Sequence, residues 1–143
     1  MPKPIGSAGT AFHQWLGLRW EPAAGEAVAV VLQMRDELRG PAGSLEGGIV
    51  ATLADVAGAS TAARALGPMV ATQHIAISYL APGRIGPIRA SGNPLRIGKQ
   101  DAVVQVTIVD LGREDRLMAI ALVTVKQLAD RTQPSSGAGG SET

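Results

Sequence analysis

The residues best suited to chemistry gather at one junction between a loop and a helix, with the sequence GSLEGGIVATLADVAGAS. Gly47 and Gly48 occupy the predicted first turn of the helix, and Asp55 follows about two turns later. The first N–H groups of a helix lack partners within it and lie at the positive end of its dipole. Because glycine lets a ligand oxygen approach the backbone, the junction is a candidate oxyanion site with a carboxylate nearby.

Both features also have a purely structural interpretation. Gly47 and Gly48 would serve equally well in a tight turn that binds nothing. Asp55 would equally be a helix-interior aspartate whose carboxylate is satisfied by a neighbouring hydroxyl or arginine. The residue types alone leave both alternatives open.

Other catalytic motifs are absent from the sequence, which contains no GxSxG elbow, HExxH pair, Walker loop or GxGxxG turn. The two histidines, His13 and His74, are far apart, so we expect each at the surface or an interface and predict no metal site. The chain has no cysteine, which excludes a cysteine nucleophile and fits a reducing compartment. We therefore predict a cytoplasmic protein whose site uses neither metal nor cofactor.

One helix must position the junction, and it is predicted at residues 46–66, before the breakers Gly67 and Pro68. Asp55 belongs to a face of small residues rather than of Lys and Glu, so we expect contacts on both sides of the helix and partial burial of Asp55. The apolar stripe comprises Ile49, Val50, Leu53, Val56 and Ala57, and the small-residue face comprises Ala51, Asp55, Gly58 and Ala62.

Strand-like runs flank the helix and predict an α+β layout. A short helical turn leads into a first strand within residues 12–22, and further strands are expected at 26–35, 69–80, 88–97, 100–111 and 116–128. In the run 69–80, strict alternation puts Thr72, His74, Ala76 and Ser78 on one polar face and Ala71, Gln73, Ile75, Ile77 and Tyr79 on the other. Pro94 cannot donate a ladder hydrogen bond, so a bulge or a sheet edge is expected there.

The composition bounds the kind of protein. With 143 residues the chain suits one domain, predicted over residues 1–128 and followed by a disordered tail at 129–143. Charged residues make up 17%, below the roughly 25% usual for soluble domains, which indicates either an apolar subunit interface or a compositional bias. A net charge of +1 and 3% aromatic residues argue against nucleic-acid binding. The opening MPKPIGSAGT does not resemble a signal peptide and no apolar run reaches transmembrane length, so no membrane association is expected.

Three segments carry a family resemblance: LEGGIVATLADVAG, TQHIAISYLAPGRIGPIRASG and RIGKQDAVVQVTIVDLG. Together they resemble the hotdog thioesterases of the PaaI-like, phenylacetate-type group, and the likeness extends over residues 12–128. The resemblance implies a hotdog fold, in which a curved antiparallel sheet of five to six strands wraps a long central helix. It also implies hydrolysis of an acyl-coenzyme A thioester by a homodimer, or by paired dimers forming a homotetramer, at a site shared between subunits.

The resemblance assigns roles to particular residues. Gly47 and Gly48 match the family's helix-opening glycines, whose amides polarise the thioester carbonyl. Asp55 matches its acidic residue, which activates a water or attacks the carbonyl, and Thr72 falls at the place of a hydroxyl that positions the water. The basic residues expected to meet the phosphates of coenzyme A, or equally to be ordinary solvated charges, are Arg84, Arg96 and Lys99.

The chain departs from the family at two polar positions. The family usually has His before the two glycines, where this chain has Glu46, and Asn six residues earlier, where it has Gly40. Each lost contact of this kind is worth on the order of 10–1,000-fold in rate, so Glu46 is expected to give a different acyl specificity or a slower reaction. The alternative is an acyl-CoA-binding module without efficient catalysis. A hotdog dehydratase is disfavoured because its histidine motif has no match in the sequence.

Overall fold

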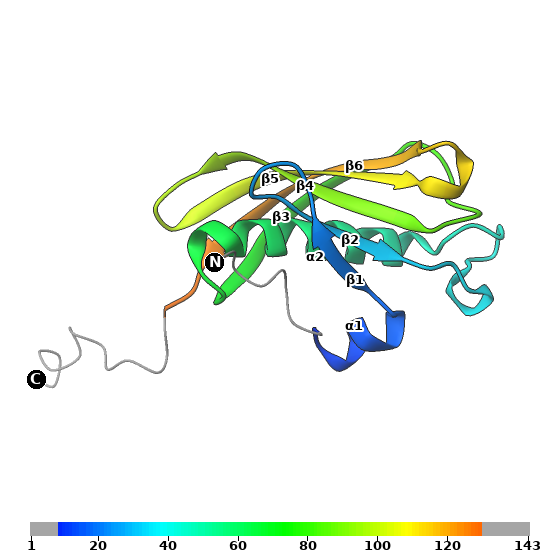
Figure 1. Ribbon diagram of the computed structural model, residues 1–143, viewed down its shortest axis with the longest axis horizontal. Helices are drawn as coiled ribbons and strands as arrows, with labels where there is room; N and C mark the ends of the chain where they lie inside the picture. Colours follow the sequence, from blue (N-terminus) through cyan, green and yellow to red (C-terminus); the bar gives the residue numbers. More distant parts are fainter. Residues whose placement is uncertain (1–8, 130–143) are drawn as a thin grey trace, which may run out of the picture.

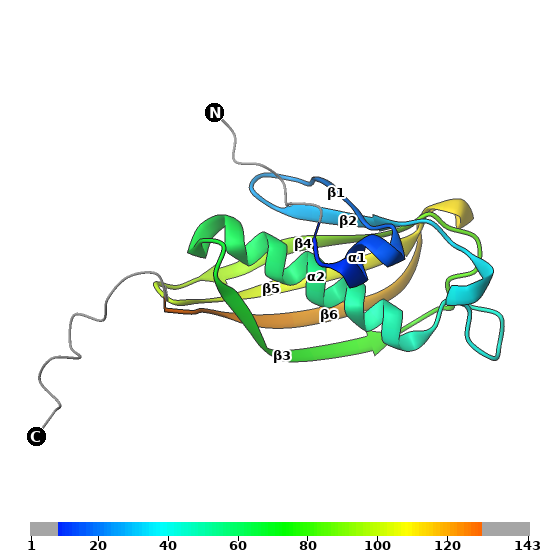
Figure 2. The same cartoon turned by 90° about the horizontal axis from the view of Figure 1, so that it is seen from below.

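The computed structural model describes residues 9–129, so the tail predicted at 129–143 lies outside the described residues except for Ala129. Six antiparallel strands form one sheet in the order β1-β2-β4-β5-β6-β3, and the sheet curves around the long helix α2 (Figure 1). The short helix α1 crosses α2 on the side away from the sheet (Figure 2). A central helix wrapped by an antiparallel sheet confirms the expected α+β hotdog architecture.

The elements lie close to those expected from the sequence. The α-helices are α1 (Ala11–Leu16) and α2 (Gly47–Leu66), and single 3-10 turns occupy Asp36–Leu38 and Leu111–Arg113. The strands are β1 (Arg19–Pro22), β2 (Val28–Leu32), β3 (Val70–Tyr79), β4 (Ile88–Ile97), β5 (Asp101–Asp110) and β6 (Arg116–Gln127). The agreement arises because glycine and proline punctuate the chain between the periodic runs.

Helix α2 packs on the sheet over a wider arc than the sequence analysis expected. Leu53 and Ala57 are fully buried, as predicted. Gly58 and Ala62, which the prediction placed on the opposite face, are buried as well, and a Cβ at Gly58 would lie 2.8 Å from Val123 Cβ. The small residues of this face therefore allow the curved sheet to approach the helix closely.

By length and composition, α2 could cross a membrane, contrary to the expectation that no segment reaches that length. However, 50% of an apolar 18-residue stretch of this helix is buried inside the fold. The core helix of a protein that wraps a sheet around it has the same apolar character. The apolar composition of α2 is therefore accounted for by its packing on the sheet.

Strand β3 forms one edge of the sheet and pairs only with β6. Its register shifts between Thr72 and His74, which marks a bulge at this point. Beyond the bulge, Ile75 and Ile77 pack against the core, and Thr72 also faces α2. The prediction that Thr72 shares a face with His74 was therefore wrong, because the extra residue reverses the alternation.

Strand β4 contains a second register shift, between Pro94 and Arg96. This shift confirms the irregularity expected at Pro94. Strand β4 pairs with β2 only over residues 88–91, so Pro94 lies beyond that pairing and is bonded to β5 alone. Both the bulge and the locally unpaired side of the strand therefore accommodate the missing proline N–H.

A buried carboxylate anchors the loop that connects β3 to β4. Asp110 is fully buried and accepts hydrogen bonds of 2.8–3.1 Å from the backbone N–H groups of Arg84, Ile85, Gly86 and Gly112. Burial raises the pKa of Asp110, but the four N–H donors outweigh it and hold the pKa below its usual value. The ionised carboxylate therefore stabilises the loop.

We expect Asp110→Asn to lower the free energy of unfolding by about 2 kcal/mol at neutral pH, since the amide replaces one acceptor oxygen by a donor. Because the pKa of Asp110 is lower in the folded than in the unfolded protein, its carboxylate contributes fully to stability above pH values of about 3.9, the ordinary Asp pKa. The contribution is lost as the pH falls through the lower pKa of the folded state. Urea denaturation of both proteins at neutral pH and near pH 3 measures the difference. If the difference in the free energy of unfolding between the two proteins is as large near pH 3 as at neutral pH, the stabilising role of the ionised Asp110 is contradicted.

Candidate active site

Asp55 projects from the middle of α2 and meets Thr72 of β3. The Thr72 hydroxyl donates a hydrogen bond of 2.6 Å to Asp55 Oδ1. Within residues 9–129, Asp55 takes part in no ion pair and its Oδ2 has no hydrogen-bond partner. The expected partial burial of Asp55 is confirmed. Thr72 thus orients the carboxylate, and its implied role in positioning a water stays a prediction.

The Asp55 carboxylate opens onto a cleft of about 730 Å³ between α1, β1, α2 and β3. This volume is in the range of small-molecule sites. Asp55 and Thr72 line one part of the cleft, and His13, Trp20 and Ser60 line another. The carboxylate is therefore neither sealed in the core nor stranded on a flat surface.

The N-terminus of α2 carries the second group of candidate residues. The amides of Ile49 and Val50 donate to the carbonyl oxygen of Glu46, whereas those of Gly47 and Gly48 have no acceptor within the described part of the chain. Both glycines are exposed, and a Cβ added at Gly48 would meet no atom within 4 Å. The predicted pair of free amides is thus present and open to a ligand.

Tyr79, which the sequence analysis did not select, covers the same helix end. Its phenol donates a hydrogen bond of 2.7 Å to the carbonyl oxygen of Gly47, yet the residue remains 54% exposed. A smaller cavity of about 370 Å³, lined by Ser44, Tyr79 and Met118 among others, reaches Gly47. Tyr79 faces α2 because it lies on the same side of β3 as Ile75 and Ile77, with which strand alternation had grouped it.

The two groups do not meet within one chain. Gly47 and Asp55 are eight residues apart on α2, which corresponds to about 12 Å along the helix axis. Thr72 and Tyr79 mark the same two ends on β3, which runs antiparallel to α2. A single chain therefore carries two separate groups of candidate residues, one with a carboxylate and one with amides.

Glu46 and Gly40, the two departures from the family pattern, are neighbours in space. A Cβ built at Gly40 would lie 3.0 Å from Glu46 Oε2. Glu46 is exposed and its side chain makes no capping hydrogen bond to α2. The Glu46 carboxylate therefore occupies space that a larger side chain at position 40 would need.

The three basic candidates do not form one patch. Arg84 lies in the loop after β3, where its guanidinium approaches the carbonyl oxygen of Ala42 at 3.4 Å. Arg96 ends β4 and pairs with Asp101 at 3.4 Å, and Lys99 follows in the turn to β5. The ten-residue strand β4 lies between Arg84 and the other two in the chain, which corresponds to about 30 Å along the sheet.

The histidines lie in different surroundings. His74 is exposed on β3, whereas His13 lines the Asp55 cleft, where sequence reasoning had placed only a surface or interface residue. Within residues 9–129, no group of three or more His, Cys, Asp or Glu side chains is arranged to hold a metal ion. The cleft residues on α1 and β1 were missed because they reach α2 only through the tertiary fold.

A family model described as the thioesterase superfamily matches residues 42–116, a segment that includes Gly47, Asp55 and Thr72. The chain belongs to the thioesterase superfamily. The family match therefore covers both groups of candidate residues and indicates hydrolysis of thioesters as the general activity. A comparison with curated proteins gives no match.

Solved structures of superfamily proteins share the fold. A protein described as coming from the thioesterase superfamily is 28% identical, with a TM-score of 0.76 over 83% of this chain and 90% of that one. A variant of the phenylacetic acid degradation protein PaaI from Thermus thermophilus is 25% identical, with a TM-score of 0.74 over 83% and 100% of the two chains. A thioesterase from Haemophilus influenzae, 21% identical, has a TM-score of 0.75 over 88% and 90%, which shows the shared fold alone. The predicted resemblance to the PaaI-like hotdog group is confirmed.

Proposed function

We propose that this thioesterase-superfamily protein hydrolyses an acyl-coenzyme A thioester at a site shared between two copies of the chain. The Asp55–Thr72 pair at the open cleft carries the proposal. One carboxylate oxygen is held by the hydroxyl, the other has no hydrogen-bond partner in the described residues, and Asp55 lines the cleft, which suits a general base. A carboxylate kept only for stability would have both oxygens satisfied, as Asp110 does.

Two copies of the chain pair through the free edge of β3 in this proposal. Val70–Tyr79 contains no Lys, Arg, Asp, Glu or Pro, so neither a charge nor a proline guards the edge against pairing. In a two-fold pairing the two β3 strands run antiparallel, so the Thr72 end of one lies beside the Tyr79 end of the other. The Asp55 carboxylate of one copy then approaches the Gly47 amide of the second copy, and the two groups together form one complete site.

The proposed reaction needs only these groups and a water. The free oxygen of Asp55 removes a proton from the water, and the resulting hydroxide attacks the carbonyl carbon of the thioester. The Gly47 and Gly48 amides of the second copy stabilise the negative charge on the carbonyl oxygen. The carbon–sulfur bond then breaks, and Asp55 returns the proton to the thiolate, giving a carboxylic acid and free coenzyme A. Incorporation of heavy oxygen from labelled water in a single turnover distinguishes this route from direct attack by Asp55.

The same two-fold pairing gathers basic residues around the substrate. It brings the end of the sheet with Arg84 in one copy toward the end with Arg96 and Lys99 in the other. We assign these side chains to the phosphates of coenzyme A, for which guanidinium and ammonium groups are suited. The cavity beside Tyr79 and Gly47 would then take the narrow arm that connects the phosphates to the sulfur.

A free-thiol assay with short-chain, long-chain and aryl acyl-CoA substrates tests the proposal. We expect at least one class to be hydrolysed by a species whose mass, measured by light scattering, is a dimer or a pair of dimers. If none of the three substrate classes releases free thiol, although circular dichroism shows that the protein is folded, the proposed hydrolytic function is overturned.

Glu46 is expected to slow this reaction, because its negative charge stands beside the amides on which a second negative charge develops. We therefore expect Glu46→Gln to raise kcat by about three- to tenfold. Glu26→Gln is the matched control, since Glu26 is exposed and pairs with Arg64 near the other end of α2. Equal turnover of wild type and Glu46→Gln in the thiol assay would show that Glu46 does not influence the reaction.

The presence of Glu46 and Gly40 at the two departing positions favours one alternative, an acyl-CoA-binding module with little turnover. Such a protein would bind acyl-CoA at the same surface but would not depend on Asp55. The Asp55 variant described in the Discussion separates the two functions.

A further inference from the structure

We propose that His13, Trp20 and Ser60 form an acyl-recognition wall, which selects an acyl group with a hydrogen-bond acceptor at the end remote from the thioester. The inference rests on the proposed hydrolysis at Asp55 and names the class of substrate. His13 lies on α1, Trp20 on β1 and Ser60 on α2, and all of them line the same cleft as Asp55.

The length of the cleft limits the acyl group. Ser60 follows Asp55 by five residues on α2, which is about 7.5 Å along the helix axis. An extended acyl chain that has its carbonyl at Asp55 reaches Ser60 after about six carbon atoms, given a carbon–carbon bond of about 1.5 Å. The indole of Trp20 stands at this point, so the cleft suits a short acyl group and not a long chain.

The wall presents two hydrogen-bond donors that lack acceptors in the described part of the chain. Ser60 Oγ accepts a hydrogen bond of 3.1 Å from Trp20 Nε1, and its own hydrogen is left for a ligand. His13 Nδ1 accepts from the backbone N–H of Thr10 at 3.3 Å, so the neutral imidazole carries its hydrogen on Nε2. Both donors become satisfied when the acyl group offers an acceptor oxygen.

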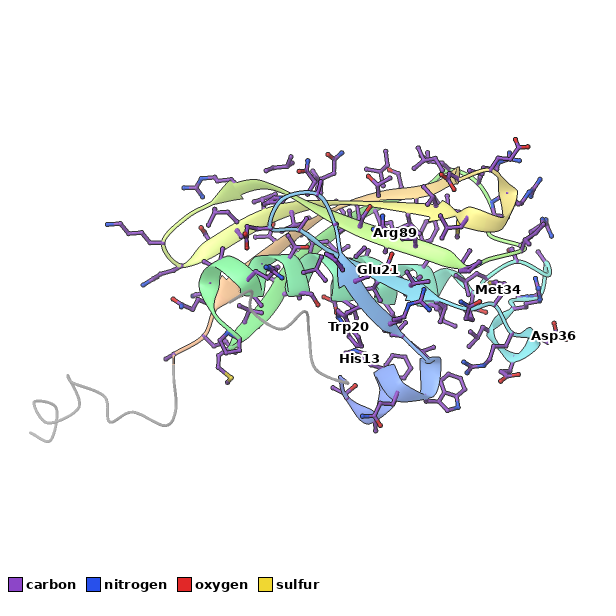
Figure 3. The ribbon with its side chains drawn as sticks, viewed as in Figure 1. His13, Trp20, Glu21, Met34, Asp36 and Arg89 are labelled. Atoms are coloured by element: carbon purple, nitrogen blue, oxygen red, sulfur yellow. The ribbon has the colours of Figure 1, made fainter. Side chains whose placement is uncertain are left out.

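The wall is held in place before any ligand binds. Thr10 and His13 form a reciprocal capping box at the start of α1, and the His13 and Trp20 rings meet edge to face at 5.8 Å (Figure 3). The guanidinium of Arg35 donates to the carbonyl oxygens of Trp15 and Leu16 at 2.9 and 3.0 Å, which fixes the other end of α1. Groups ordered in advance lose little entropy on binding, so they discriminate well between ligands.

An acyl group without an acceptor oxygen near its far end leaves the donors of the wall without partners, and donors that a ligand shields from water without pairing them are costly. We therefore expect kcat/KM to be about tenfold higher for 5-oxohexanoyl-CoA than for hexanoyl-CoA, two substrates of equal chain length. Ser60→Ala and His13→Phe should each reduce this preference to about twofold. Trp20→Phe keeps the Ser60 hydroxyl and should retain most of the preference while raising KM for both substrates.

Ser91→Ala is the matched control, because Ser91 is a serine of β4 that does not line the cleft. Thermal denaturation of each variant shows whether a lost preference reflects loss of the fold. The proposal is overturned if wild type shows no preference, or if Ser60→Ala and His13→Phe leave the preference unchanged.

Binding measurements keep this test separate from the proposed function. Dissociation constants of the two acyl-CoA molecules are measured by calorimetry on Asp55→Asn, which should not hydrolyse them. If wild type turns over neither substrate but Asp55→Asn binds the oxo compound about tenfold more tightly, acyl recognition stands and hydrolysis falls. If wild type hydrolyses both equally and the dissociation constants are also equal, hydrolysis stands and the recognition wall falls.

Discussion

Asp55→Asn should lower kcat for acyl-CoA hydrolysis by about 10³-fold, within the usual contribution of a general base. The amide has nearly the same shape and still accepts the hydrogen bond from Thr72, but it cannot take a proton from water. The affinity for acyl-CoA should change little, since the fold and the cleft remain. Free-thiol release measures the rate, and calorimetry measures the dissociation constant.

Two further variants test whether the loss of activity is specific to Asp55. Thr72→Val leaves the carboxylate but removes the hydroxyl that orients it, so a smaller loss of about tenfold is expected. Asp115→Asn changes an exposed aspartate in the turn before β6, where its backbone has the positive φ that asparagine also tolerates, and should have no effect. Turnover by Asp55→Asn equal to wild type would exclude Asp55 as the base, and negligible turnover by both proteins would favour the binding module.

Gly47→Pro should lower kcat by about 10²–10³-fold, because it removes one amide from the proposed oxyanion site. Proline is tolerated at the first residue of a helix, and Glu46 already has the extended backbone (φ −53°, ψ 133°) that a following proline requires. Gly47→Ala is the matched control, since it keeps the N–H and its Cβ would lie 3.8 Å from Tyr79, an ordinary contact. Equal rates for the two variants would show that the Gly47 amide takes no part.

Mixing the two inactive proteins tests whether the site is shared. If Asp55 and the Gly47 amide come from different copies, half of the dimers formed by random exchange of Asp55→Asn and Gly47→Pro subunits are mixed, and each mixed dimer has one intact site. The mixture should therefore recover about a quarter of the wild-type activity. No recovery, with exchange verified by mass spectrometry of the mixed dimers, would place both groups in the same copy.

The local pattern of the sequence was sufficient for the elements and their α+β layout, whereas the hotdog fold was implied by the family resemblance. The helix could be placed from its breakers and from the apolar periodicity between Gly47 and Leu66, and the strands from their alternation. Gly47, Gly48 and Asp55 could be selected as well, because the chemistry of a helix N-terminus and of a carboxylate depends on residue type and spacing. Pro94 likewise predicted a bulge, since the missing N–H is a local property.

Other features depended on contacts between distant parts of the chain, which no local pattern records. The bulge between Thr72 and His74 places these two residues on opposite faces of the sheet, and only the pairing of β3 with β6 reveals the bulge. The position of the Glu46 carboxylate beside Gly40 likewise appears only in the folded loop.

The sequence by itself determined the fold class and the candidate acidic and amide groups, because helix periodicity, strand alternation and residue chemistry are local. The tertiary structure decided which groups meet: it joined Asp55 to Thr72, placed Tyr79 on Gly47, and brought Trp20 to Ser60 across 40 residues of sequence. It also showed that Asp55 and Gly47 stay apart within one chain, since both are fixed on the same rigid helix.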